Sequence, residues 1–118
     1  MPSLLDHYDQ CRKILCNTAK RRETITYGNL AKELGLRLPR QAWNTVLDPI
    51  YEAEMRKTGK DLTLVVVYAS GPAKKLCRYF SNGQPARTKR LNPRNVRQVS
   101  DYKRELEKVF DAYAVMDC

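Results

Sequence analysis

Apolar residues recur at helical spacing at both ends of the chain. Within residues 3–21 they alternate in steps of four and three, as in Leu4, Tyr8, Cys11 and Leu15. This spacing places them on one face and predicts a first amphipathic helix. Residues 96–114 carry the same pattern and predict a helix that closes the chain.

Two shorter helices are expected between these ends, at 25–35 and 39–47. Thr26 is suited to cap the start of the first, and Gly35 to end it in the left-handed conformation. The second runs into Pro49, which cannot donate to the helical ladder and disfavours helical angles in the residue before it. We therefore expect a helix that is kinked or divided at this proline.

A β-branched run follows at 62–69, then a Ser-Gly-Pro-Ala turn, then a shorter apolar run at 76–80. We expect two antiparallel strands that form a hairpin. Both faces of the first strand are largely apolar, which predicts that it is covered on both sides. Residues 81–95 contain two prolines and no apolar period and are expected to form a long loop.

The order of helix, turn, helix and hairpin is that of a winged helix-turn-helix. The fold class we expect is mainly α with a small antiparallel β-sheet (α+β), extended by a basic loop and a C-terminal helix. At 118 residues the chain should form a single domain, residues 1–118. Its core would span 1–80, the basic loop 81–95 and the C-terminal helix 96–114.

The charge of the chain is strongly positive and unevenly placed. Lys and Arg number 22 against 13 Asp and Glu, which leaves a net charge of +9. Between Lys74 and Gln98 there are eight cations and no acid, and the segment 11–22 holds five more cations without an acid. Such one-signed stretches favour a polyanionic partner, above all nucleic acid. An acidic protein partner and a merely solvated surface stay open as alternatives.

Double-stranded DNA is the partner we expect. In a helix-turn-helix the N-terminal half of the second helix enters the major groove, where Arg prefers guanine and Asn or Gln prefers adenine. Arg40, Gln41 and Asn44 occupy that half, although any exposed helix carries polar residues of this kind. The expected DNA-binding residues are Tyr27, Arg37, Arg40, Gln41, Asn44, Thr45, Lys74, Lys75, Arg87, Lys89, Arg90, Arg94 and Arg97.

A short motif adds a family resemblance. Thr26, Tyr27, Gly28, Leu30 and Ala31, followed one helix later by Arg40, resemble the TYG-x-[LIV]-A helix and the arginine of the alkyltransferase and alkyltransferase-like proteins. The resemblance implies that Tyr27 lies against a DNA phosphate and that Arg40 enters the base stack while a nucleotide is flipped. The family's reactive Pro-Cys-His-Arg motif is absent, and residues 65–68 (Val-Val-Val-Tyr) stand roughly in its place. The resemblance therefore supports DNA binding and not alkyl transfer.

No residue pattern points to catalysis or to a metal. Alkyl transfer needs a thiolate activated by a nearby histidine, and the only histidine is His7. No phosphate-binding glycine loop, GxSxG or HExxH occurs, and Asp48, Glu52 and Glu54 look like surface acids. The cysteines lack the paired spacing of a zinc site, and we expect them to be reduced; they are Cys11, Cys16, Cys77 and Cys118. We expect no enzyme activity, no cofactor and no metal.

The function we expect is non-catalytic binding of double-stranded DNA by a small regulator of transcription or of a mobile element. A homodimer would read two half-sites. One alternative is a winged-helix interaction module, an inhibitor or adaptor docking on an acidic protein surface, and another is RNA binding by stacking on Tyr68 and Tyr79. The longest apolar stretch, 64–69, is too short to span a bilayer, and no secretion signal is recognisable. We therefore expect no membrane partner and a cytoplasmic location, nucleoid-associated if the source is bacterial.

Overall fold

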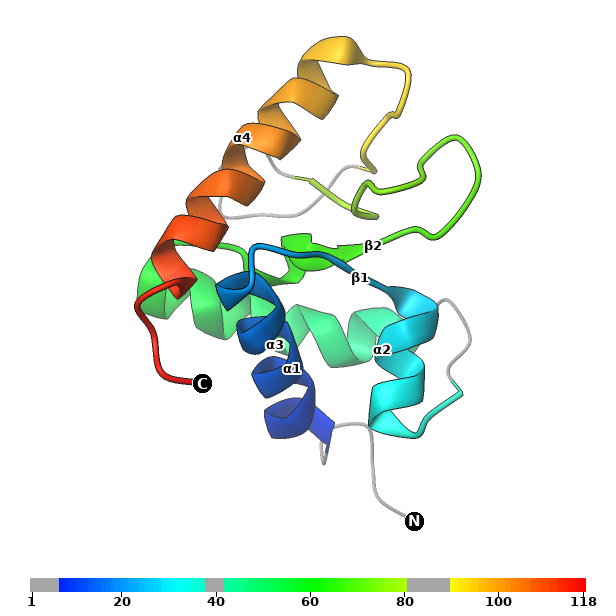
Figure 1. The fold of residues 1–118 in the computed structure, drawn as a ribbon. Coiled ribbons are helices and arrows are strands. Elements are labelled where there is room, and N and C mark those ends of the chain that lie inside the picture. The colour runs from blue at the N-terminus through cyan, green and yellow to red at the C-terminus, as the bar shows by residue number, and fades with distance from the viewer. Residues whose placement is uncertain (1–6, 38–41, 81–89) are drawn as a thin grey trace.

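The computed structural model describes residues 7–37, 42–80 and 90–118. In chain order its elements are α1 (Tyr8–Lys20), β1 (Ile25–Thr26), α2 (Tyr27–Leu34), α3 (Ala42–Thr58), a 3₁₀ helix (Leu62–Val65), β2 (Val66–Val67) and α4 (Val96–Tyr113). Helix α1 packs against α3, α4 and the 3₁₀ helix and so lies at the centre of the fold (Figure 1). The chain is therefore mainly helical with a small sheet, which agrees with the α+β prediction.

Two capping residues determine where α2 begins and ends. The Thr26 hydroxyl accepts a hydrogen bond from the Asn29 N–H (3.1 Å), which satisfies one of the donors left free at a helix start. Gly35 adopts the left-handed conformation (φ 69°) at the other end, where a residue without Cβ carries no steric penalty. Both predicted caps are confirmed.

Helix α3 runs without a break through Pro49, so the divided form of the expected helix is wrong, and the kinked form stays a prediction. A proline removes one helical hydrogen bond, here the bond to the Thr45 carbonyl. Thr45 is exposed, so water can hydrate that carbonyl. Trp43, Leu47 and Ile50 are buried on the opposite face and hold the whole helix on the core.

The sheet is parallel, and the predicted antiparallel hairpin is wrong. β1 and β2 pair in register, Ile25 with Val66 and Thr26 with Val67. The two helices between the strands, α2 and α3, return the chain to the same end of the sheet. Parallel strands require a long crossover connection of this kind, whereas antiparallel strands need only a tight turn.

The β-branched run begins as a 3₁₀ helix at Leu62–Val65 and not as a strand. The Asp61 carboxylate accepts hydrogen bonds from the Thr63 N–H (3.0 Å) and from the Thr63 hydroxyl (2.5 Å), which caps the start of this helix. Every residue from 62 to 67 is buried. The cover predicted on both sides of the run 62–69 is therefore confirmed for residues 62–67, whereas Tyr68 is half-buried and Ala69 is exposed.

Two hydrogen bonds close residues 68–76 into the turn expected after this run. The Tyr68 N–H donates to the Leu76 carbonyl (3.1 Å), and the Tyr68 carbonyl accepts from the Lys75 N–H (3.0 Å). Gly71 takes the left-handed conformation (φ 82°), which a residue without Cβ adopts at no steric cost.

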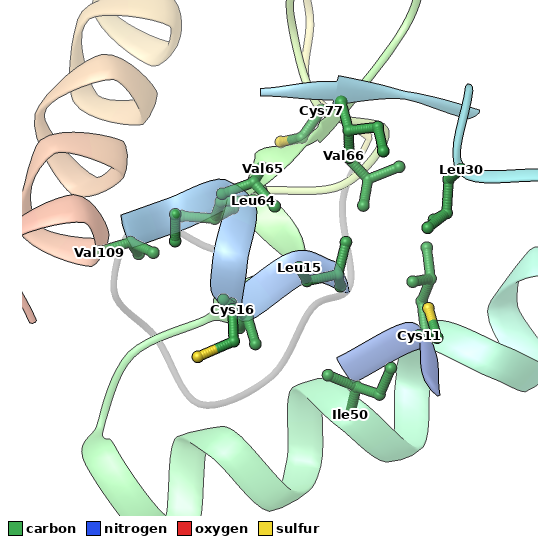
Figure 2. Packing of buried hydrophobic residues seen from close by; sticks show 14 of the residues in the cluster. Cys11, Leu15, Cys16, Leu30, Ile50, Leu64, Val65, Val66, Cys77 and Val109 are labelled. Atoms are coloured by element: carbon green, nitrogen blue, oxygen red, sulfur yellow. The ribbon is translucent and has the colours of Figure 1, made fainter. Parts of the chain in front are cut away.

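The core collects side chains from the helices and from β2. Figure 2 shows Leu15 of α1, Ile50 of α3 and Val109 of α4 in one cluster. Each such side chain contributes about 1.5–3 kcal/mol when it is fully buried. Tyr102 fixes α4 over the cluster, because its enclosed hydroxyl donates a hydrogen bond of 2.8 Å to the Leu64 carbonyl.

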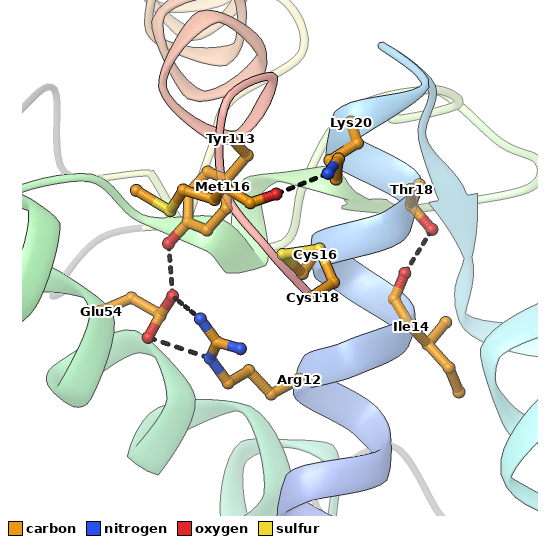
Figure 3. The surroundings of a disulfide bond; sticks show 9 residues. All are labelled: Arg12, Ile14, Cys16, Thr18, Lys20, Glu54, Tyr113, Met116 and Cys118. Carbon is orange, nitrogen blue, oxygen red and sulfur yellow. Dashed lines mark hydrogen bonds and ion pairs between the residues drawn. A yellow bond between two sulfur atoms is a disulfide. The ribbon is translucent and has the colours of Figure 1, made fainter.

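A disulfide ties the C-terminal tail to α1. Cys16 and Cys118 are joined at an S–S distance of 2.04 Å, across 102 residues of chain (Figure 3). The expectation of reduced thiols is wrong for this pair, because sequence spacing does not reveal which cysteines the packing of α1 and α4 brings together. Lys20 Nζ also donates to the Met116 carbonyl (2.5 Å), so the tail is held at two points.

Candidate nucleic-acid interface

A hollow of about 200 Å³ opens where α2, α3 and the end of β2 meet. It is lined by Tyr27, Gly28, Trp43, Tyr68, Ala69, Ser70 and Arg78. Three aromatic rings and one guanidinium therefore surround a single space. Apolar walls with a few convergent polar groups are typical of a ligand-binding site.

The parallel sheet brings two of these rings together. Thr26 pairs in register with Val67. The residues that follow, Tyr27 and Tyr68, therefore lie next to each other where the two strands end. Their ring centroids lie 5.7 Å apart, and the Tyr27 ring lies 5.5 Å from Trp43 in an edge-to-face arrangement. Trp43 is only 5% exposed and forms the buried side of the hollow.

Arg78 adds the only charged side chain that the described part of the chain contributes to the lining. Its guanidinium carbon lies 5.1 Å from the centroid of the Tyr79 ring, which is a cation–π contact. The Arg78 carbonyl accepts from the Leu91 N–H (3.2 Å), and Tyr79 forms an antiparallel bridge with Arg90. This single bridge stands where a strand was predicted at 76–80, and it holds Arg90 against the segment that lines the hollow.

Five of the predicted DNA-binding cations lie in the 68–76 turn, which contributes to the hollow, or in residues 90–97, which lead into α4. We call them the basic rim: Lys74, Lys75, Arg90, Arg94 and Arg97. All five are exposed, and none forms an ion pair with a carboxylate of the described residues. Figure 1 shows the 68–76 turn and the segment leading into α4 on the same side of the molecule as α2. The positive charge of the rim is therefore available to a polyanion.

The cations at the end of α1 are instead engaged within the protein. Arg22 lies 2.5 Å from Glu107 and 2.8 Å from Asp111, both on α4. Arg21 lies 3.3 Å from Glu23. The positive stretch predicted at 11–22 is thus partly neutralised and joins α1 to α4, so we leave it out of the candidate interface.

Helix α3 carries acidic residues that follow its first turn in the sequence. Asn44 is half-buried and Thr45 is exposed, and both line a shallow groove on the outer face of α3 together with Asp48, Pro49 and Glu52. Carboxylates in this groove would repel DNA phosphates. Only the first turn of α3 therefore suits contact with DNA.

The other predicted site residues fall into two groups. Arg37 is exposed in the connection between α2 and α3. Four residues lie outside the part of the chain that the structure describes: Arg40, Gln41, Arg87 and Lys89. Their predicted roles stay predictions.

Most residues that line the hollow were not predicted as parts of a DNA-binding site. Tyr68 was considered only for RNA stacking, Arg78 was counted only among the eight cations of residues 74–98, and Trp43, Ala69 and Ser70 were given no binding role. The register of the β1–β2 pair is the information that was missing, because Tyr27 and Tyr68 become neighbours once the two strands are known to be parallel.

The free cysteines are poorly suited to nucleophilic chemistry. Burial raises the pKa of the Cys11 thiol to about 12, so this thiol is protonated at neutral pH. Cys77 is also buried, and its Sγ donates to the Tyr79 carbonyl (3.0 Å). Within residues 7–37, 42–80 and 90–118, no group of three His, Cys, Asp or Glu side chains is arranged to hold a metal ion. Over the same ranges, no helix has the length and apolarity needed to cross a membrane.

Comparisons with known proteins add no assignment to this geometry. No family model, curated protein or solved structure matches the chain. The resemblance to alkyltransferase-like proteins therefore rests on the motif around Tyr27 and on Arg40 alone.

Proposed function

We propose that this protein binds double-stranded DNA without catalysis, as a small regulator of transcription or of a mobile element. The basic rim is the observation that carries the proposal. Its five exposed cations have no carboxylate partner among the described residues. Lys74 and Lys75 lie in the turn that contributes to the aromatic hollow, and Arg90 is bridged to Tyr79 beside it. On a duplex, such cations contact phosphates and supply most of the affinity.

In this proposal α2 and α3 serve as a helix-turn-helix, and the 68–76 turn serves as the wing of a winged helix. Lys74 and Lys75 would lie on the phosphate backbone while the first turn of α3 enters the major groove. There Asn44 would bond adenine and Arg40 guanine. Base readout would stop after this turn, because the acids of the groove, Asp48 and Glu52, follow it.

DNA binding implies action in the cytoplasm or, in a bacterium, in the nucleoid, where cellular reductants attack disulfides. The Cys16–Cys118 bond joins α1 to the C-terminal tail, on a different side of the molecule from the 68–76 turn (Figure 1). We therefore expect DNA binding in both redox states. Two copies of the chain would read two half-sites.

Fluorescence anisotropy of a labelled random duplex tests the proposal. Five phosphate contacts predict a slope of log affinity against log salt of about −4.5, which is about a 500-fold loss between roughly 50 and 200 mM. Unlabelled duplex should compete better than single-stranded RNA or polyglutamate. Absent or salt-independent binding would overturn the proposal. Stronger competition by RNA would favour RNA as the partner, and stronger competition by polyglutamate would favour an acidic protein.

A further inference from the structure

We propose that the hollow between α2, α3 and the 68–76 turn binds a free small molecule that consists of a planar aromatic ring with an anionic edge, such as an aromatic carboxylate. This proposal does not depend on DNA binding. It concerns a binding site for an effector, and it is argued from the seven described residues that line the hollow.

The walls of the hollow suit one flat ring. Tyr27, Trp43 and Tyr68 are arranged around it, with Tyr27 edge-on to Trp43 and tilted by 44° against Tyr68. Aromatic rings prefer such edge-to-face and offset partners, so a planar ligand adds contacts that a puckered one cannot make. A volume of about 200 Å³ lies below the roughly 300 Å³ at which pockets for drug-sized ligands begin. One ring or two fused rings are therefore the largest occupants that fit.

The positive charge of Arg78 favours a ligand that carries a carboxylate on the edge of its ring. Arg78 is the only ionic side chain among the described residues that line the hollow, and the cation–π contact with Tyr79 restrains its guanidinium. The planar fork of a guanidinium matches the two oxygens of a carboxylate. The Ser70 hydroxyl lines the same hollow and provides a second donor.

Gly28 keeps part of the hollow open. A Cβ built at Gly28 would meet no atom within 4 Å. The residue lies inside α2 with no need for a left-handed backbone, so a larger side chain is compatible with the helix. A leucine here would occupy space at the hollow without removing any aromatic ring.

The position of the hollow gives its occupant a regulatory role. The ligand would contact the start of α2 through Tyr27, the start of α3 through Trp43 and the 68–76 turn through Ser70. It would thereby fix the relative positions of three segments that are separate in the chain. We therefore assign the site to an effector and not to a substrate.

Trp43 is the only tryptophan of the chain and lines this hollow, so all tryptophan fluorescence comes from one wall of the site. Benzoate is the probe, cyclohexanecarboxylate is the control with equal charge and no planar ring, and benzamide is the neutral ring. We expect benzoate to change the emission saturably with a dissociation constant of about 1 mM or tighter, given its few atoms. Both controls should bind about tenfold more weakly.

Variants separate the ring contact from the charge contact. Arg78→Gln should weaken benzoate about tenfold and leave benzamide unchanged. Tyr68→Ala should weaken both rings about fivefold or more, whereas Tyr68→Phe should retain them. Gly28→Leu should block both rings, and circular dichroism should show that every variant is folded.

Three results would overturn the proposal. The first is the absence of a saturable response to benzoate up to about 10 mM in the folded protein. The second is an equal response to cyclohexanecarboxylate, or a response that survives both Arg78→Gln and Gly28→Leu. The third is a Trp43 response to duplex DNA with none to the free acids, because the hollow would then accept a base of the nucleic acid and no free effector.

Discussion

The Tyr113 hydroxyl of α4 donates a hydrogen bond of 2.5 Å to Glu54 Oε1 of α3, across 59 residues of chain. Arg12 of α1 donates two further bonds to the same carboxylate, at 3.3 Å each (Figure 3). Glu54 is only 1% exposed, so it is not the surface acid that the sequence suggested. A buried carboxylate is tolerated when it is paired and hydrogen-bonded, and here that requirement joins three helices.

Tyr113→Phe should lower the free energy of unfolding by about 1–3 kcal/mol, because it removes one of the bonds that satisfy the buried Glu54 carboxylate. Tyr68→Phe is the matched control, since no hydrogen bond of the described residues involves that hydroxyl. Urea denaturation of both variants measures the difference. Equal midpoints for the two would show that the Tyr113 bond adds nothing to stability.

Stability should fall at alkaline pH. Burial raises the pKa of the Cys11 thiol from 9.0 to about 12, and burial together with the Glu54 hydrogen bond raises the pKa of Tyr113. The folded chain holds these protons more tightly than the unfolded chain, so the stabilisation is complete below about pH 9 and is lost as the pH rises toward 12. Unfolding free energies measured from pH 8 to 11 should decline, and Cys11→Ala should flatten the decline. A decline of unchanged steepness in the variant would contradict the role of this thiol.

Reduction of the Cys16–Cys118 disulfide should lower stability by up to about 4–5 kcal/mol, because the bond closes a loop of roughly 100 residues in the unfolded chain. Reductant should therefore lower the melting temperature of the native protein and leave that of Cys118→Ser unchanged. Cys77→Ser, a change at a free cysteine, should stay sensitive to reductant. A native protein that melts at the same temperature with and without reductant would refute this prediction.

Two substitutions on α3 test where base readout ends. Asn44→Ala should cost about 1–3 kcal/mol on a preferred duplex and relax the preference at one position. Asp48→Asn should instead strengthen binding to all sequences, because it removes a carboxylate that repels phosphates. Binding of both variants to a selected site and to random duplex can be compared by anisotropy. An equal loss on every sequence for Asn44→Ala would mean that this turn contacts only the backbone.

Features with local causes could be predicted from the sequence. Thr26 and Gly35 cap α2 through contacts with the adjoining backbone, and the apolar period of residues 96–114 reappears as α4 (Val96–Tyr113). Pro49 misled the prediction of a divided helix, because the exposure of Thr45 to water and the burial of residues on both sides of the proline outweigh one lost hydrogen bond.

Features that depend on distant partners could not be predicted in this way. The run Leu62–Val67 has the composition of a strand, but the Asp61 cap and the return of the chain beside β1 give it a 3₁₀ turn and a parallel pairing. The Cys16–Cys118 bond follows from the packing of α4 on α1. The hollow exists because the register sets Tyr27 beside Tyr68, and no pattern along the chain reveals that register.

The salt dependence of DNA binding by two triple variants tests the central claim most directly. One variant replaces Lys74, Lys75 and Arg90 of the basic rim with Gln. The other replaces three lysines of equal charge away from the rim, namely Lys13 on α1, Lys57 in the last turn of α3 and Lys60 just after that helix. Both should melt near the native temperature, since such surface changes typically alter stability by less than about 0.5 kcal/mol each.

Each lost phosphate contact removes about 0.9 from the slope of log affinity against log salt. The rim variant should therefore bind random duplex more weakly, with a slope flattened by about 2–3, while the control variant keeps the native slope. An unchanged slope in a folded rim variant, or an equal change in both variants, would contradict the assignment of the basic rim to DNA.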